Sequence, residues 1–180
     1  ENQTLMKRDI ELKKDIYKKQ GNTEAYREEL KNLILFFNDT NIDNYIELRS
    51  HYNDKDWITE RDSLIEQLTP GRFLCEILET EQLYGQLFDV ILGSNNRDLL
   101  HQYTHVLNDE YPEKLLQLYR EIVEKQAEST GSRQHYRQIV EDLRIMKSIN
   151  DGDKVVDEII KKWKVQYKNR SAMLDELNRV

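Results

Sequence analysis

Two stretches of the sequence repeat one pattern: Gly21-Asn-Thr-Glu-Ala-Tyr26-Arg27-Glu-Glu-Leu30 and Gly131-Ser-Arg-Gln-His-Tyr136-Arg137-Gln-Ile-Val140. In each stretch a glycine ends one helical segment, and a Tyr-Arg pair then opens the apolar stripe of the next. Helix pairs repeated along a chain form an α-solenoid, in which each pair buries one face against its neighbours. The two stretches lie 110 residues apart, which leaves room for about three intervening helix pairs.

The rest of the chain also follows helical spacing. At the start, a ragged helical stripe stops at Gly21, and its apolar positions are Leu5, Ile10, Leu12, Ile16 and Tyr17. No later segment alternates apolar with polar residues as a half-buried strand does. Clusters of turn residues separate the stripes at 38–41, 93–96 and 150–153. The strongest break is Thr-Pro-Gly at 69–71, because proline cannot continue a helix and glycine accepts turn dihedrals.

These patterns predict an all-α protein of about ten helices, arranged as stacked antiparallel helical hairpins in an α-solenoid superhelix. The expected architecture is TPR-like, although the Trp-Leu-Gly-Tyr pattern of tetratricopeptide repeats is missing. We expect residues 1–180 to form a single helical-repeat domain. If the domain is subdivided, the boundary is expected at 69–71.

Composition narrows the classes of function. The charged fraction of 34% with only two prolines and six glycines is typical of a helix-rich soluble protein. A net charge of −7 argues against bulk attraction to nucleic acid or to an anionic membrane. The single cysteine, Cys75, cannot form an internal disulfide and fits a reducing compartment, so a cytoplasmic location is expected. No apolar run is long enough for a membrane span and no signal peptide is visible. Because the first residue is Glu1 and not Met, we expect a piece of a longer protein.

The basic run at 161–170, Lys-Lys-Trp-Lys-Val-Gln-Tyr-Lys-Asn-Arg, carries five positive charges and no acid. Basic residues interleaved with aromatic residues can indicate nucleic-acid binding. On a helix, however, Trp163 and Tyr167 share one stripe with Ile159, so the rings are expected to face the core. The cations then form a solvent-facing row, and the candidate nucleic-acid or anion contacts are Lys161, Lys164, Lys168 and Arg170.

Residues that could carry chemistry are sparse. His101 and His105 lie one helical turn apart, a spacing that can chelate a metal. The run between them lacks the glutamate that acts as base in a zinc-protease helix, and no third ligand is apparent nearby. Cys75 lies among apolar residues, which indicates a buried, inert thiol. The sequence contains no phosphate-binding glycine loop and no serine elbow. We therefore predict no enzymatic activity, no catalytic residue, no metal site and no cofactor.

Three segments carry a family resemblance. The first is 45–48, Tyr-Ile-Glu-Leu, followed by 57–65, Trp-Ile-Thr-Glu-Arg-Asp-Ser-Leu-Ile. The second runs from 111–112, Tyr-Pro, to 118–120, Leu-Tyr-Arg. The third is the fullest, and its positions are Tyr136, Arg137, Leu143, Met146, Trp163, Tyr167, Arg170, Met173, Leu174, Glu176 and Leu177. Over residues 26–180 the chain thus resembles the C-terminal helical region of bacterial SWIM zinc-finger domain-containing proteins.

The resemblance implies that the chain is the tail of such a bacterial protein, without its zinc module. The family's Cys-x-Cys…Cys-x-His motif lies upstream of the helices, and one cysteine cannot supply it, so no metal site carries over. In that family the zinc module is thought to contact DNA or proteins, whereas the helical tail has no assigned activity.

The sequence therefore favours a non-enzymatic helical-repeat scaffold that binds a protein partner or an upstream domain of the same chain, with no membrane contact. The alternative is a nucleic-acid-associated module that uses the basic row in 161–170.

Overall fold

The computed structural model describes residues 2–37 and 42–180, which form eleven helices and no strand. The prediction of an all-α fold with packed neighbouring helices is confirmed. The turn expected at 38–41 lies outside the described residues. Contacts between helices divide the chain into two compact units, Glu1–Asn95 and Asn96–Val180, and Pro70 and Gly71 lie inside the first.

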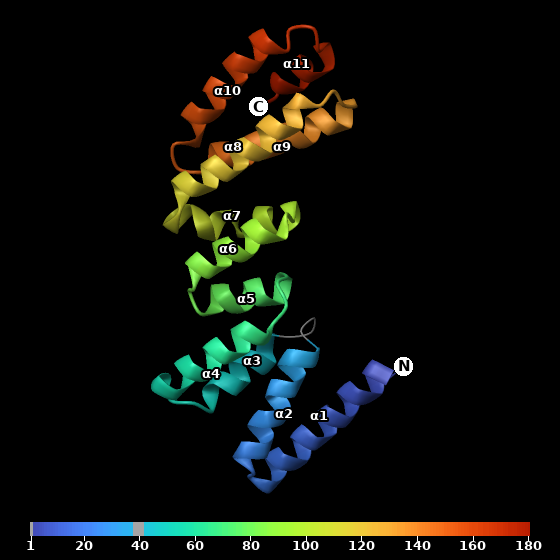
Figure 1. The fold of residues 1–180 in the computed structure, drawn as a ribbon, viewed down its shortest axis with the longest axis vertical. Helices are drawn as coiled ribbons and strands as arrows, with labels where there is room; N and C mark the ends of the chain where they lie inside the picture. Colours follow the sequence, from blue (N-terminus) through green and yellow to red (C-terminus); the bar gives the residue numbers. More distant parts are fainter. Residues whose placement is uncertain (1, 38–41) are drawn as a thin grey trace. The chain divides into compact units, whose positions relative to one another are not determined.

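The described residues of the first unit form six helices, and α2 lies at the centre of the N-terminal half of this unit. Helix α2 packs against α1, α3 and α4, and α3 continues the packing to α5, which pairs with α6 (Figure 1). The α2 face buried by this packing carries Tyr26, Leu30, Leu33 and Ile34. The helices are α1 (Asn2–Gln20), α2 (Thr23–Phe36), α3 (Ile42–Ser50), α4 (Asp54–Gln67), α5 (Arg72–Thr80) and α6 (Tyr84–Ser94).

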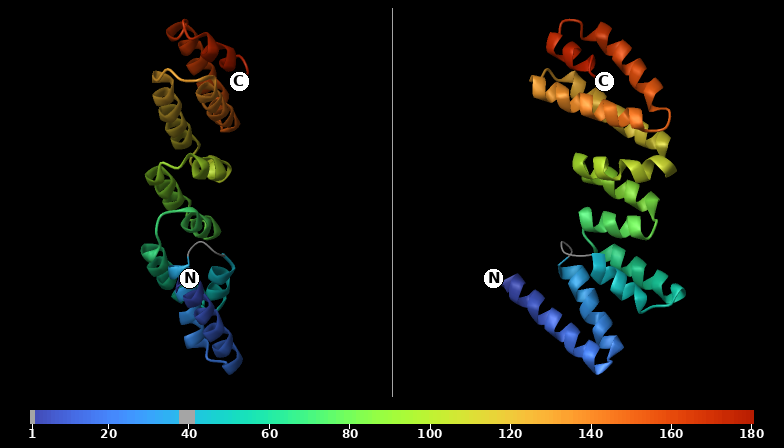
Figure 2. Two further views of the ribbon diagram at one scale, coloured as in Figure 1. Left: turned by 90° about the vertical axis from the view of Figure 1, so that its right-hand side faces the viewer. Right: turned by 180° about the vertical axis from the view of Figure 1, so that it is seen from behind.

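The second unit contains five helices, and most of them pack on α9. Helices α8, α10 and α11 all lie against α9, while α7 packs on α8 (Figure 2). The α9 side chains buried by this packing are Tyr136, Ile139, Val140, Asp142, Leu143 and Met146. The helices are α7 (Arg97–Glu110), α8 (Pro112–Glu128), α9 (Arg133–Ser148), α10 (Gly152–Gln166) and α11 (Ser171–Leu177).

The two repeated stretches, at 21–30 and 131–140, each begin in a turn between two helices that pack together. Gly21, with a φ of 69°, ends α1, and the Asn22 side chain then caps α2 by accepting a hydrogen bond from the Ala25 N–H at 3.2 Å. Gly131 lies between α8 and α9, and its N–H donates to the Tyr136 hydroxyl at 3.2 Å. The repeated sequence pattern therefore marks the same structural position, the turn of a helical hairpin, in both units.

Candidate functional site

Helix α1 exposes an apolar face that no described residue covers. Leu5, Leu12 and Ile16 are 64%, 55% and 51% exposed. Their spacing of seven and four residues places them in one row along the helix. Ile10 lies on the opposite side, where it is 6% exposed and packs with Leu33 and Phe37. The ragged stripe predicted from the sequence is therefore two separate faces, one buried against α2 and one open.

Polar contacts also join α1 to its neighbouring helices. The Lys18 Nζ donates to the Glu47 Oε1 on α3 at 2.8 Å, and the Tyr26 hydroxyl donates to the same oxygen. Partial burial of the Glu47 carboxylate favours a higher pKa, but the hydrogen bonds from Lys18 and Tyr26, together with nearby positive charge, lower the pKa below its ordinary value. The hydrogen bond to Glu47 is also the main reason that the pKa of Lys18 rises to about 12. Both partners are therefore charged at neutral pH, and α1 is fixed to α2 and α3 together.

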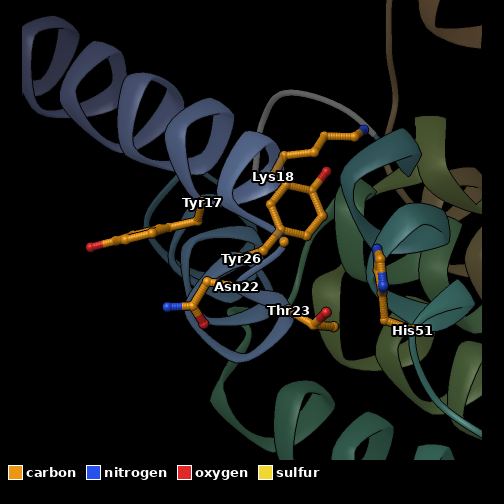
Figure 3. Close-up of a pocket in the computed structure, with 7 residues that line it drawn as sticks. Tyr17, Lys18, Asn22, Thr23, Tyr26 and His51 are labelled. Atoms are coloured by element: carbon orange, nitrogen blue, oxygen red, sulfur yellow. The ribbon is translucent and has the colours of Figure 1, made fainter.

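A small cavity lies beside these contacts, at the junction of α1, α2 and α3 (Figure 3). In Figure 3 the Lys18 side chain runs alongside the Tyr26 ring, while the Tyr17 side chain points away from it. The volume of the cavity is about 90 Å³, which is the volume of roughly three water molecules. Ligand pockets usually have volumes of several hundred Å³. The cavity is therefore too small to hold a metabolite. The residues that line it are Tyr17, Lys18, Gly21, Asn22, Thr23, Tyr26 and His51.

Charged residues border the exposed apolar row of α1 on both sides, and within the described residues they are in an ion pair on one side only. On one side, helical geometry places Arg8 and Lys19 next to the row, and both are exposed. On the other side, Asp9 and Lys13 form an ion pair at 2.7 Å, so their charges cancel. Asp15, which is also exposed and forms no ion pair with another described residue, lies beside the row on the same side as Arg8, one turn before Lys19. The open face of α1 is therefore an apolar row whose border carries a net charge of +1 from Arg8, Lys13, Lys19, Asp9 and Asp15.

The basic run at 161–170 is only partly a free surface, and it extends beyond α10, which ends at Gln166, so Lys168 and Arg170 are not on the predicted helical row. Lys161, Lys164 and Lys168 are exposed, and no ion pair joins them to another described residue. As predicted, Trp163 faces the core, with 1% of its surface exposed. Arg170 instead donates to the main-chain carbonyls at the end of α8, at 2.6 Å to Ala127, 3.2 Å to Glu128 and 3.3 Å to Ser129. The Arg170 guanidinium thus provides hydrogen-bond donors for the unpaired carbonyl groups at the C-terminus of α8. Because it is engaged there, it is poorly placed to bind an external anion.

The two histidines considered as metal ligands, His101 and His105, have different partners. The His101 Nε2 lies 2.8 Å from the Oδ1 of the buried Asp142, which also accepts a hydrogen bond from the Arg97 Nε at 2.9 Å. His105 is exposed, and its Nδ1 lies 3.0 Å from the carbonyl of its neighbour Gln102. Within the described parts of the chain, no group of three or more histidine, cysteine and acidic side chains could hold a metal ion.

Cys75 is fully buried in α5, as the sequence predicts. Burial raises the pKa of its thiol to about 11, because the thiolate would lose its hydration. At neutral pH the sulfur is therefore protonated and unreactive, and the side chain acts as a small core residue.

Comparisons of the chain with family models, with curated proteins and with solved structures gave no match. The resemblance to the C-terminal region of SWIM zinc-finger proteins stays a prediction. Among the helices of the described residues, none combines the length and the apolar character that crossing a bilayer requires.

Proposed function

We propose that the chain is a non-enzymatic helical-repeat protein that binds a protein partner, or another domain of its own chain, through the open face of α1. The observation that carries the proposal is the row of Leu5, Leu12 and Ile16, each at least half exposed on the side of α1 that faces away from α2. A row of apolar side chains along one helix is the usual footprint of helix-mediated binding.

The packing of α1 supports the same conclusion. The ion pair between Lys18 and Glu47 and the packing of Ile10 on Leu33 join α1 to α3 and α2, so the helix is ordered in the free chain. A surface that is already ordered loses little conformational entropy on binding, so most of the free energy of apolar burial contributes to affinity.

The test replaces the three apolar residues together, as Leu5→Gln, Leu12→Gln and Ile16→Gln. Because the side chains are exposed and glutamine is a good helix former, we expect the free energy of unfolding to change by less than about 1 kcal/mol. Partner binding should weaken by at least about 100-fold, since apolar anchors at the centre of an interface carry most of its energy. Co-purification with quantitative mass spectrometry, followed by titration of the partner found, measures the loss.

The matched control is the pair Ile58→Gln and Leu92→Gln on α4 and α6, whose exposure of 51% each is similar to that of the α1 residues. This control should retain every partner of the unaltered chain. If the α1 variant and the control co-purify with the same proteins in the same amounts, the open face of α1 is not the binding surface.

The alternative function, nucleic-acid association through the basic row, has one observation in its favour: Lys161, Lys164 and Lys168 are exposed and not in ion pairs with described residues. We expect weak binding at most, because Trp163 is buried and offers no ring on which a base could stack. Changing the three lysines to glutamate should leave the retention of DNA and RNA oligonucleotides in low-salt gel shifts unchanged within about twofold. A strongly salt-dependent affinity that disappears in this variant would instead favour the alternative.

A further inference from the structure

We infer that the partner presents to α1 a single amphipathic helix whose apolar stripe is bordered by aspartate or glutamate. This inference rests on the proposed function and specifies the chemistry of the partner. It follows from two properties of the open face, the shape of its apolar row and the sign of its unpaired charges.

The shape of the row selects a helix. From Leu5 to Ile16 the row extends over eleven residues, or roughly 16 Å along the helix, and it is one side chain wide. A second helix laid along such a row meets it with side chains at i, i+4, i+7 and i+11, which is about three turns of contact. The described residues contain no strand, so no sheet edge is present there for strand addition.

The charges on α1 indicate which charge the partner helix carries beside its apolar stripe. Helix α1 contains six basic and three acidic residues, a difference of +3, in a chain whose net charge is −7. Several of these charges are already engaged. Lys18 binds Glu47 and Lys13 binds Asp9, whereas Arg8 and Lys19 beside the row form no ion pair with another described residue. Asp15 lies on the same side and is also exposed without an ion pair to a described residue, so these three charges sum to +1. Acidic side chains on the partner would complete two ion pairs there, whereas basic ones would meet like charges.

Charged residues at the rim of an interface contribute more to the specificity of binding than to its affinity. An exposed ion pair contributes at most about 1 kcal/mol, whereas buried apolar anchors each contribute more. We therefore expect the apolar row to set the affinity and the Arg8/Lys19 border to set the preference between partners.

Two labelled helical peptides of about 18 residues test the inference by fluorescence anisotropy against the full chain. Both carry leucine at i, i+4, i+7 and i+11, and the positions beside the leucines are glutamate in one peptide and lysine in the other. At low ionic strength the glutamate peptide should bind at least about tenfold more tightly, and the preference should shrink as salt is added. The double variant Arg8→Glu and Lys19→Glu should reverse the preference, whereas the control Lys55→Glu, an exposed cation on α4, should preserve it.

The outcomes separate the two levels of the proposal. Equal binding of both peptides that is lost in Leu12→Gln would overturn the acidic border but leave α1 as a binding face. No binding of either peptide, or binding that Leu12→Gln does not change, would count against the α1 face itself and therefore against both. If sedimentation shows a dimer that Leu12→Gln dissociates, the occupant is a second copy of the chain, and the acidic helix is excluded. Circular dichroism of each variant checks that the helix content of the chain is retained.

Discussion

Replacing Gly152 with alanine is expected to destabilise the second unit by about 3 kcal/mol or more. A Cβ atom at this position would lie 1.7 Å from the carbonyl oxygen of Met146 and 3.4 Å from the Cδ2 of Leu116. The first neighbour is backbone, so no side-chain rotation relieves the clash, and the turn between α9 and α10 must open. Asp151 already adopts a left-handed conformation in this turn, with a φ of 62°, which leaves little room for adjustment.

The control for this prediction is Gly93→Ala, because a Cβ atom at Gly93 would have no heavy atom within 4 Å. Gly93 lies near the end of α6, so alanine there should be neutral or stabilising by up to about 1 kcal/mol. Each unit contains one buried tryptophan, Trp57 in the first and Trp163 in the second. Urea unfolding of a Trp57→Phe background followed by Trp163 fluorescence therefore reports on the second unit alone. An unchanged unfolding midpoint for Gly152→Ala would contradict the close approach of the two helices.

The sequence was sufficient to predict the class of fold because helical signals are local. Turn residues and N-caps such as Asn22 and Asn53 act within a few positions of the chain, and the structure uses both as caps. The turn predicted at 150–153 is shorter in the structure, because α10 already begins at Gly152. The left-handed residue is Asp151, and Gly152 is needed because another helix's carbonyl lies against it, a contact that local spacing does not reveal.

The candidate site was harder to predict, although part of its signal was present. Leu5, Leu12 and Ile16 share one angular position on a helix and Ile10 another, so the helical angle of each residue could have separated the two faces. Which of the two faces α2 covers depends on tertiary packing and could not be read from α1. Arg170 shows the same limit, since its three carbonyl partners lie more than 40 residues away.

The buried carboxylate of Asp142 gives the second large prediction. Asp142 lies on α9 with 0% exposure, and its Oδ1 meets both the Arg97 Nε and the His101 Nε2 of α7. The His101 ring in turn stacks on Tyr119 of α8, so one carboxylate joins three helices. Asp142→Ala would leave His101 without its carboxylate partner and Arg97 with only the exposed Glu141 at 3.7 Å among the described carboxylates. Removing one partner of a buried ion pair typically costs about 3–5 kcal/mol. Arg97 and His101 are each 27% exposed at the side chain, so water compensates in part and we expect the lower end, about 3 kcal/mol.

The adjacent residue provides a control in which burial is the main difference. Glu141 precedes Asp142 on α9 and pairs with the same arginine at 3.7 Å, but its side chain is 63% exposed. Because water screens that pair, Glu141→Ala should change the free energy of unfolding by no more than about 0.5 kcal/mol. The measurement is again urea unfolding followed by Trp163 fluorescence in the Trp57→Phe background. Equal effects of the two substitutions would mean that the contacts of Asp142 contribute no more than a surface ion pair, and that apolar packing alone holds α7 and α8 to α9.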